Sequence, residues 1–247
     1  MEAYAYGAYA YAIMGDSHAH HHPSAMRNRG PILEALRKVL PAELPASAEA
    51  LEIGSGSGCH LELFAEQLTD LRWQPSEFIP GTTADVGKIG AARSFDGDSD
   101  RTLSLIDTYG CKRSPNVLPA IALDASAEAW PEAVTAKTGA FELVYCSNVT
   151  HISPWEVTRG IMAGGAALLH AKGRLVVYGP FKRGGSFTTE SNRSFDESLR
   201  QRNPAWGYRD VESEVVPAAE ACGLVLLECV EMPANNFILA FGKSEAR

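Results

Sequence analysis

The chain has 247 residues, of which 45% are hydrophobic and 21% are charged. This length suits one large domain or two small ones, and the composition is that of a soluble globular protein. The formal net charge of -8, from 22 Lys and Arg against 30 Asp and Glu, argues against a protein that binds the nucleic-acid backbone, which requires a basic face.

Residues 1–26 are predicted to form a flexible tail. Residues 1–17 are a low-complexity run rich in Ala and Tyr, and a histidine cluster follows at positions His18, His20, His21 and His22. Imidazole side chains suit zinc, copper or nickel, but no Cys, Asp or Glu completes a site at zinc-like spacing. We therefore predict no metal site and interpret the histidines as part of the tail.

Residues 27–247 are predicted to form a single domain of alternating helices and strands. The first helix is expected to begin at Pro31, because proline suits the first helical position, and to end before Pro41. Apolar runs predict strands at 50–53, 71–78, 118–123, 141–146, 174–178, 224–230 and 237–241, and helical spacing predicts helices at 61–68, 103–109, 155–170 and 211–221. Strands that are apolar throughout indicate an α/β fold, with a mostly parallel sheet covered on both faces.

A glycine-rich turn, Gly54 to Gly58, directly follows the first strand. Glycine permits a tight bend and the close approach of a ligand to the backbone. The turn differs from a dinucleotide-binding fingerprint, because its third glycine comes one residue early. Glu52 stands two residues before the turn, where a carboxylate repels a pyrophosphate but suits the cationic amino end of S-adenosylmethionine. The alternative interpretation is a plain turn between a strand and a helix.

Further polar residues stand where the other strands end. The carboxyl ends of parallel strands meet at one edge of a sheet, near the point where the strand order reverses. Glu77 is placed to accept hydrogen bonds from ribose hydroxyls, and Asp124 from an adenine amino group. Each is an ordinary strand-end residue by itself, but their joint spacing favours an adenosine site. The expected cofactor-binding residues are Glu52, Gly54, Ser55, Gly56, Gly58, Glu77, Asp124, Ala125 and Asn148.

Four long and unusual strings lie beyond the first strand: WQPSE at 73–77, NVTHISPWE at 148–156, SNRSFDESLRQRNPAWGYRD at 191–210 and MPANN at 232–236. With the pair Arg27-Asn28 before PILEAL, they resemble the methyltransferase-like-26 family, which is also described as a domain of unknown function. The resemblance covers the chain from about residue 27 to its end. Two departures are the Glu at position 77, where the family usually has Asp, and residues 81–98, which look like an insertion.

The resemblance implies a class I methyltransferase fold, which is a Rossmann-like, doubly wound sheet of seven strands with the last one antiparallel. It also implies S-adenosylmethionine as the cofactor and S-adenosylhomocysteine as the product. It adds two residues, Arg27 and Asn28, to the expected cofactor site.

His151 is the candidate catalytic base, because the pKa of a free imidazole lies near neutrality. Methyl transfer mostly requires that donor and acceptor be held in line away from water, and a base is needed only if the acceptor must lose a proton. The alternative is a structural histidine that holds its loop in place. Trp155 either lines the same cleft or anchors the core.

The segment 191–210 is the candidate acceptor-binding region, because it is polar and yet contains three aromatic residues. Arginine binds carboxylates in a bidentate manner, so we expect a small anionic or zwitterionic acceptor. An internal salt-bridge network is an equally good interpretation of the same arginines. The expected acceptor-binding residues are His151, Trp155, Asn192, Phe195, Arg200, Trp206, Arg209 and Asn235.

The sequence thus predicts an S-adenosylmethionine-dependent methyltransferase with an oxygen, sulfur or nitrogen acceptor. One alternative is a non-catalytic S-adenosylmethionine-binding module or partner subunit on the same fold. Another is a nicotinamide-dependent oxidoreductase, against which Glu52 and the early third glycine argue.

The chain is expected to be cytoplasmic, with an organelle left open. Its five cysteines form no CxxC pair, which indicates a reduced compartment. No apolar run approaches the roughly 20 residues that a membrane span needs, so we expect no membrane partner. We expect the partner to be a small-molecule methyl acceptor and not nucleic acid. The sequence does not decide between a monomer and a homodimer.

Overall fold

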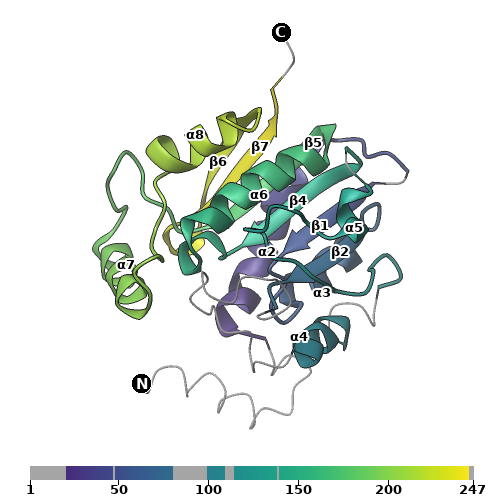
Figure 1. The fold of residues 1–247 in the computed structure, drawn as a ribbon, viewed down its shortest axis with the longest axis horizontal. Helices are drawn as coiled ribbons and strands as arrows, with labels where there is room; N and C mark the ends of the chain where they lie inside the picture. The colour runs from purple at the N-terminus through teal and green to yellow at the C-terminus, as the bar shows by residue number, and fades with distance from the viewer. Residues whose placement is uncertain (1–20, 47, 80–98, 109–113, 138, 245–247) are drawn as a thin grey trace.

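The computed structural model describes residues 21–46, 48–79, 99–108, 114–137 and 139–244 (Figure 1). These residues form one seven-stranded sheet in the order β3-β2-β1-β4-β5-β7-β6. Strands β1 to β5 pair in parallel, and β7 is antiparallel to both β5 and β6, which confirms the predicted α/β sheet with an antiparallel last strand. The strands are β1 (Glu49–Ile53), β2 (Arg72–Glu77), β3 (Ile121–Ala122), β4 (Phe141–Ser147), β5 (Leu169–Gly179), β6 (Leu224–Met232) and β7 (Asn236–Lys243).

Helices cover both faces of the sheet (Figure 1). One apolar cluster joins the sheet to α2 (Pro23–Val39), α3 (Cys59–Gln67) and α4 (Ser99–Ile106). The other joins it to α5 (Glu132–Thr135), α6 (Trp155–Leu168) and α8 (Val216–Glu220). Alternate residues of β4 enter different clusters, Tyr145 the first and Val144 the second, because successive side chains of a strand point to opposite faces. This burial on both faces explains why the strands are apolar throughout.

The strand order reverses between β1 and β4, which lie side by side with Ile53 opposite Cys146. At such a reversal the connections leave in opposite directions, and ligands of open α/β sheets bind outside the carboxyl ends of the strands there. The glycine turn follows β1, and Asn148 follows β4. The fold therefore places both predicted features at the reversal.

The first described helix begins earlier than the sequence predicts. The prediction of a start at Pro31 is wrong: α2 begins at Pro23, which has no N–H to leave unpaired at the first helical position, and Pro31 lies inside the helix. The side chain of His22 caps the helix, and His21 is buried. Residues 21–26 thus belong to the folded domain, in contrast to the predicted tail at 1–26, of which residues 1–20 lie outside the described residues.

Two further elements differ from the prediction. The strand expected at 118–123 is reduced to two residues, because Pro119 has no N–H for a sheet ladder. The segment 191–210 contains a helix, α7 (Glu190–Arg202), that hydrophobic spacing does not reveal. The face that α7 buries consists of Asn192, Asp196 and Leu199, so its inward side is mostly polar. The insertion expected at 81–98 lies outside the described residues.

Candidate functional site

The glycine turn between β1 and α3 is held by its neighbours on both sides. Gly54, Gly56 and Gly58 have φ angles of 74°, 58° and 75°, in the left-handed region that favours glycine. The N–H groups of Gly54 and Ser55 donate to the carbonyl oxygen of Ser76 at 3.0 and 2.9 Å. A Cβ on Gly54 would lie 2.8 Å from Val149, so the turn also packs closely against the loop after β4.

Glu77 connects the end of β2 to the same turn. Its Oε2 accepts a hydrogen bond from the Gly56 N–H at 2.7 Å, and its Oε1 accepts one from the Phe78 N–H at 3.0 Å. Burial raises the pKa of this carboxyl, and the two backbone donors oppose that rise. Each carboxylate oxygen can accept further hydrogen bonds, so the half-buried side chain keeps capacity for a ligand.

Glu52 is buried beneath the turn with only one of its two carboxylate oxygens partnered among the described residues. The residue is 1% exposed, and its Oε2 has no hydrogen-bond partner among the described residues. Burial raises its pKa to about 7, the hydrogen bond from Ser55 opposes this, and the charge of Glu77 adds to it. A buried carboxylate oxygen without a partner is costly, and a cation placed beside it removes that cost.

A chain of polar side chains extends from Glu52 to β5. His60 Nδ1 lies 4.0 Å from Glu52 Oε1, and His60 Nε2 lies 2.8 Å from Asn28 Oδ1. Asn28 also hydrogen-bonds Tyr178. Burial and the charges of Arg29 and His21 lower the pKa of His60 to about 4, so this imidazole is neutral at neutral pH. If Nε2 carries the proton of the neutral His60 ring, the lone pair of Nδ1 faces the carboxylate of Glu52. Two hydrogen-bond acceptors then face each other.

The beginning of α2 contributes to this group of residues. His21 Nδ1 lies 2.8 Å from the hydroxyl of Ser57 in the turn, and Arg29 forms an ion pair with Glu62 of α3 at 2.9 Å. The two predicted cofactor residues on this helix differ in their surroundings. Asn28 contacts His60 near the strand ends, whereas Arg27 is exposed.

Asp124 lies at the β3 end of the sheet, where its Oδ1 accepts hydrogen bonds from the N–H and the hydroxyl of Ser126 at 2.8 and 2.7 Å. The following residue, Ala125, is buried against α6. A Cβ on Gly160 of α6 would lie 1.7 Å from the carbonyl oxygen of Ala125. Because Gly160 has no side chain, the loop that contains Ala125 can lie directly against α6.

His151 lies in the loop after β4 and is 4% exposed. Its Nδ1 has no hydrogen-bond partner among the described residues, and its ring meets those of Phe195 and Tyr208 edge-on, with centroids 6.1 and 6.0 Å away. Burial and the charge of Arg209 lower its pKa to about 4. The side chain is thus a neutral imidazole at neutral pH and a weaker base than the sequence suggests.

Three arginines of the segment 191–210 contact other groups of the same chain. Arg209 is buried, donates to the carbonyl oxygens of residues 150, 153 and 205, and lies over the ring of Trp155. Arg200 forms an ion pair with Asp196 at 2.8 Å, and Arg202 lies over the ring of Trp206. The structure therefore favours the internal network over an anion-binding role for Arg200 and Arg209.

Asn192 connects α7 to the turn before β7. Its Nδ2 donates to the hydroxyl of Thr188 at 3.0 Å and to the carbonyl oxygen of Asn235 at 3.3 Å. Asn235 is exposed and has a φ of 56°. These two predicted acceptor residues are brought together, but the contact between them is made through the Asn235 backbone.

The chain matches the family described as "Protein of unknown function (DUF938)" over residues 19–243. It belongs to the DUF938 family.

Solved structures share the fold of this DUF938 chain. The Mitomycin 7-O-methyltransferase MmcR has a TM-score of 0.65 at 16% identity, and the match covers 92% of this chain and 56% of the MmcR chain. CalO1, a methyltransferase in calicheamicin biosynthesis in its SAH-bound form, has a TM-score of 0.59 at 13% identity, and the match covers 92% of this chain and 56% of CalO1. LepI in complex with SAM has a TM-score of 0.58 at 14% identity, and the match covers 86% of this chain and 46% of LepI.

The DUF938 chain spans about half the length of these three proteins. At such identities the likeness shows the fold alone, which is the Rossmann-like fold of class I methyltransferases. It confirms the fold class that the sequence predicts.

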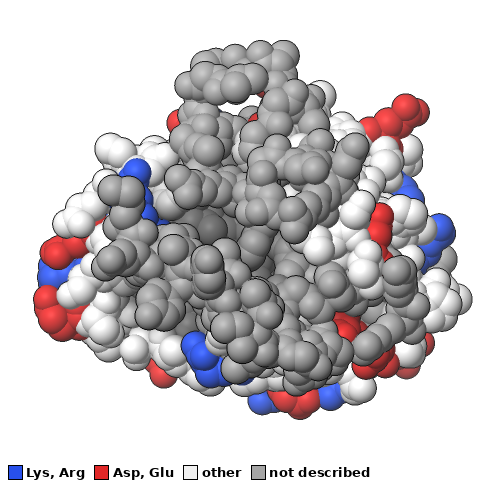
Figure 2. All heavy atoms as spheres, turned by 90° about the horizontal axis from the view of Figure 1, so that it is seen from below, with Lys and Arg blue, Asp and Glu red and all other residues white. Residues whose placement is uncertain are grey.

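Seen from below, both the described Lys and Arg side chains and the described Asp and Glu side chains lie scattered around the rim of the molecule (Figure 2). Within the described ranges, no three His, Cys, Asp or Glu side chains are grouped to hold a metal ion, and no described helix is long and apolar enough to cross a membrane.

Sequence reasoning did not single out His60 or Tyr178. His60 stands two residues after the glycine turn, which is the only signal that the sequence offers for it. Tyr178 is the second-last residue of β5 and follows an apolar run, so the sequence pattern is that of a core residue. Both become part of the site because Asn28 of α2 hydrogen-bonds to each of them.

Proposed function

We propose that this DUF938 protein is an S-adenosylmethionine-dependent methyltransferase of a small molecule, within the methyltransferase-like-26 group that its sequence resembles. The observation that carries the proposal is the buried carboxylate of Glu52, whose Oε2 has no partner among the described residues. The α-ammonium group of S-adenosylmethionine supplies the cation that such a carboxylate requires. The SAH-bound CalO1 and the SAM complex of LepI, which share the fold, support the proposal.

The predicted cofactor residues have distinct proposed roles. Glu52 binds the ammonium group, and the turn from Gly54 to Gly58, with Ser55 in it, offers backbone groups at close approach. Glu77 binds the ribose hydroxyls, and Asp124 with Ala125 binds the adenine. When bound, the cofactor supplies an electrophilic methyl group on a sulfonium. Arg27 stays a prediction, and Asn28 acts by holding His60 and Tyr178 in place.

The finer parts of the prediction stay proposals. His151 is available as a proton acceptor, because its imidazole is neutral, but its pKa of about 4 makes it a weak one. A small anionic or zwitterionic acceptor loses the support of Arg200 and Arg209, which are paired internally. A cytoplasmic location and a homodimer are likewise predictions.

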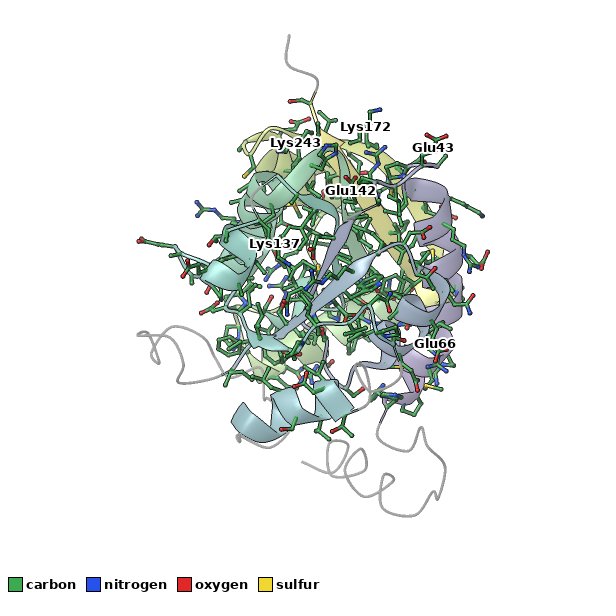
Figure 3. The ribbon with its side chains drawn as sticks, turned by 90° about the vertical axis from the view of Figure 1, so that its right-hand side faces the viewer. Glu43, Glu66, Lys137, Glu142, Lys172 and Lys243 are labelled. Atoms are coloured by element: carbon green, nitrogen blue, oxygen red, sulfur yellow. The ribbon has the colours of Figure 1, made fainter. Side chains whose placement is uncertain are left out.

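The test is calorimetric titration of S-adenosylmethionine and S-adenosylhomocysteine into the wild-type protein and Glu52→Gln. A charge-assisted hydrogen bond is worth about 1.5–3 kcal/mol, so the variant is expected to bind about 10- to 100-fold more weakly. Glu142→Gln is the matched control. Glu142 is also buried, but it stands at the start of β4, at the opposite end of the sheet near Lys172 (Figure 3), 3.1 Å from His170.

Absence of binding of either compound at millimolar concentration contradicts the proposal. Equal affinity in wild type and Glu52→Gln contradicts the role of Glu52. Tight binding without turnover of any acceptor supports the alternative of a non-catalytic S-adenosylmethionine-binding module.

A further inference from the structure

A groove of about 930 Å³ lies between α6 and the segment formed by η3 (Val211–Val215) and α8. These elements pack on one face of the sheet, whereas α3, which follows the glycine turn, packs on the other (Figure 1). Sites for small molecules usually enclose about 300–1,000 Å³. The groove is therefore large enough for a small molecule, and none of the described residues that line it belongs to the glycine turn or is Glu52 or Glu77.

Three charged side chains line the groove, and two of them face a charge of the protein itself. Burial lowers the pKa of the Arg209 guanidinium, and the charges of Glu214 and Glu156 oppose that fall. Glu214 also accepts a hydrogen bond from the Asp210 N–H at 2.7 Å. The third side chain, Arg159, is exposed and forms no ion pair or hydrogen bond with a described residue. The groove therefore presents a cation that suits the anionic group of a ligand.

Two serine hydroxyls in the wall of the groove are left as acceptors. Ser126 Oγ donates to Asp124 Oδ1 at 2.7 Å, and Ser213 Oγ donates to Asp210 Oδ1 at 2.8 Å. A hydroxyl has a single hydrogen and two lone pairs, so each serine oxygen can still accept a hydrogen bond but has no second hydrogen to donate. These oxygens suit an N–H or O–H group of a ligand.

Trp155 adds an aromatic side chain to the wall at the start of α6. It is half-buried, and the guanidinium of Arg209 lies over its ring at 5.7 Å from the centroid, which holds the indole in place. The wall beyond it consists mostly of small residues, which include Gly160, Ala163, Ala218 and Ala221. An apolar wall with a few polar groups is typical of small-molecule sites, and this one suits a flat ring.

The groove borders the loop that carries Asp124. Ser126, which lines the groove, donates to Asp124 Oδ1 through its N–H at 2.8 Å as well as through its hydroxyl. Gly160, which also lines the groove, lies against the preceding residue, because a Cβ on it would be 1.7 Å from the carbonyl oxygen of Ala125. A molecule in the groove therefore touches the residues that hold Asp124 in position.

We propose that this groove binds a small aromatic carboxylate that bears an N–H or O–H group, and that the bound molecule increases the affinity for S-adenosylmethionine. The carboxylate pairs with Arg159, the ring lies along Trp155 and the small residues, and the N–H or O–H group donates to a serine oxygen. The increase in affinity rests on the proposed function, in which Asp124 binds the adenine. A molecule that contacts Ser126 restrains the Asp124 loop beforehand, so cofactor binding has less to order.

The test is calorimetric titration of three probes into the wild-type protein. Indole-3-acetate has the ring, the N–H and the carboxylate, indole-3-acetamide lacks the charge, and cyclohexylacetate lacks the aromatic ring and the N–H. Indole-3-acetate is expected to bind at least about tenfold more tightly than either of the others, because a charge-assisted hydrogen bond is worth about 1.5–3 kcal/mol and a neutral one about 0.5–1.5 kcal/mol.

Two variants locate the binding. Arg159→Gln removes the exposed cation and is expected to bind indole-3-acetate about tenfold more weakly, with no change for indole-3-acetamide. Ala163→Phe fills the groove from an exposed position of α6, so it should fold and weaken the binding of both indole probes. Lys38→Gln is the matched control, because it removes an exposed positive charge from α2 and should leave all three affinities unchanged.

The effect on the cofactor site is measured by titrating S-adenosylhomocysteine with and without saturating indole-3-acetate. Coupling between two sites typically changes affinity by about 5- to 150-fold, so the probe is expected to tighten S-adenosylhomocysteine binding at least about fivefold. Coupling is reciprocal, so S-adenosylhomocysteine should tighten binding of the probe by the same factor. Arg159→Gln at the same probe concentration should show much less of this gain.

The proposal is overturned if indole-3-acetate does not bind, if either of the other probes binds as tightly, or if Arg159→Gln binds it as wild type does. It is also overturned if saturating probe leaves the affinity for S-adenosylhomocysteine unchanged. Each of these outcomes leaves the proposed function intact when S-adenosylhomocysteine binds. A protein that does not bind S-adenosylhomocysteine contradicts the proposed function and the coupling, whereas probe binding that depends on Arg159 still supports the groove as a site.

Discussion

Glu52 and His151 show how burial changes an ionisable residue. Each lies near a strand end with one side-chain atom that has no hydrogen-bond partner among the described residues, and in each burial favours the neutral form. The sequence places His151 as a base because the pKa of a free imidazole is near neutrality. The fold lowers this pKa to about 4, so His151 is better suited to hold a hydrogen bond than to take up a proton strongly.

The pKa of Glu52 predicts an unusual dependence of stability on pH. The carboxyl has a pKa of about 7 in the folded protein, against its ordinary value of 4.5, so the folded state binds more protons between these values. Its contribution to stability is therefore lost as the pH rises from 4.5 to 7, and the loss is complete above 7. At ~1.4 kcal/mol per pKa unit, the loss is of the order of 3 kcal/mol.

The Gln side chain of Glu52→Gln does not ionise, so the variant does not lose this stability as the pH rises. Without ligand, urea denaturation at pH 5 and pH 8 should show the variant gaining stability relative to the wild type as the pH rises, by about 2–3 kcal/mol. A difference between the two proteins that does not change with pH contradicts the raised pKa.

At the scale of elements, packing between α6 and the loop after β3 supports the adenine side of the proposed site. Gly160→Ala places a Cβ against the carbonyl oxygen of Ala125, and backbone cannot move aside as a flexible side chain can. Overpacking of this kind costs about 1–3 kcal/mol, and the shifted loop is expected to weaken S-adenosylhomocysteine binding as well. Urea denaturation and calorimetry measure the two effects.

Gly30→Ala serves as the control, because it adds the same methyl group to another helix, α2, at a position where no described residue lies within 4 Å of the new Cβ. It should leave ligand affinity unchanged. If Gly160→Ala binds S-adenosylhomocysteine like the control, the Asp124 loop has no part in cofactor binding.

Helix α7 is not predicted by hydrophobic spacing, because the face that it buries is mostly polar. On its buried face, Asp196 accepts a hydrogen bond from the Tyr208 N–H and forms an ion pair with Arg200, and Asn192 donates a hydrogen bond to the hydroxyl of Thr188. Hydrophobic periodicity detects a helix only when its inward face is apolar. The cap that starts α7, Thr189 accepting from the N–H of Asn192, was the available local signal.

At the scale of the whole molecule, the proposed site is assembled from strand ends that are distant in sequence, so ligand binding should stabilise the entire sheet. S-adenosylhomocysteine at 100 times its Kd is expected to raise the free energy of unfolding by about 2.7 kcal/mol. For a chain of this size this corresponds to an increase in Tm of about 5–10 °C. Thermal unfolding measured by circular dichroism checks the shift.

Glu52→Gln at the same ligand concentration should show much less of this increase, since it binds more weakly. A ligand that binds in calorimetry and leaves the Tm of the wild type unchanged does not bind the folded sheet preferentially, and that result contradicts a site at the strand ends.

The sequence by itself determined the alternation of strands and helices, the position of the glycine turn and the polar residues that end β1, β2 and β4. These features are local, because hydrophobic spacing and glycine chemistry act over a few residues. Only the tertiary structure decided the rest. It paired Arg200 and Arg209 with groups of the same chain, placed His60 beside Glu52 and buried His151 with its Nδ1 unpartnered among the described residues. Partners and burial come from segments far apart in the chain, and the charge state of a buried group follows from them.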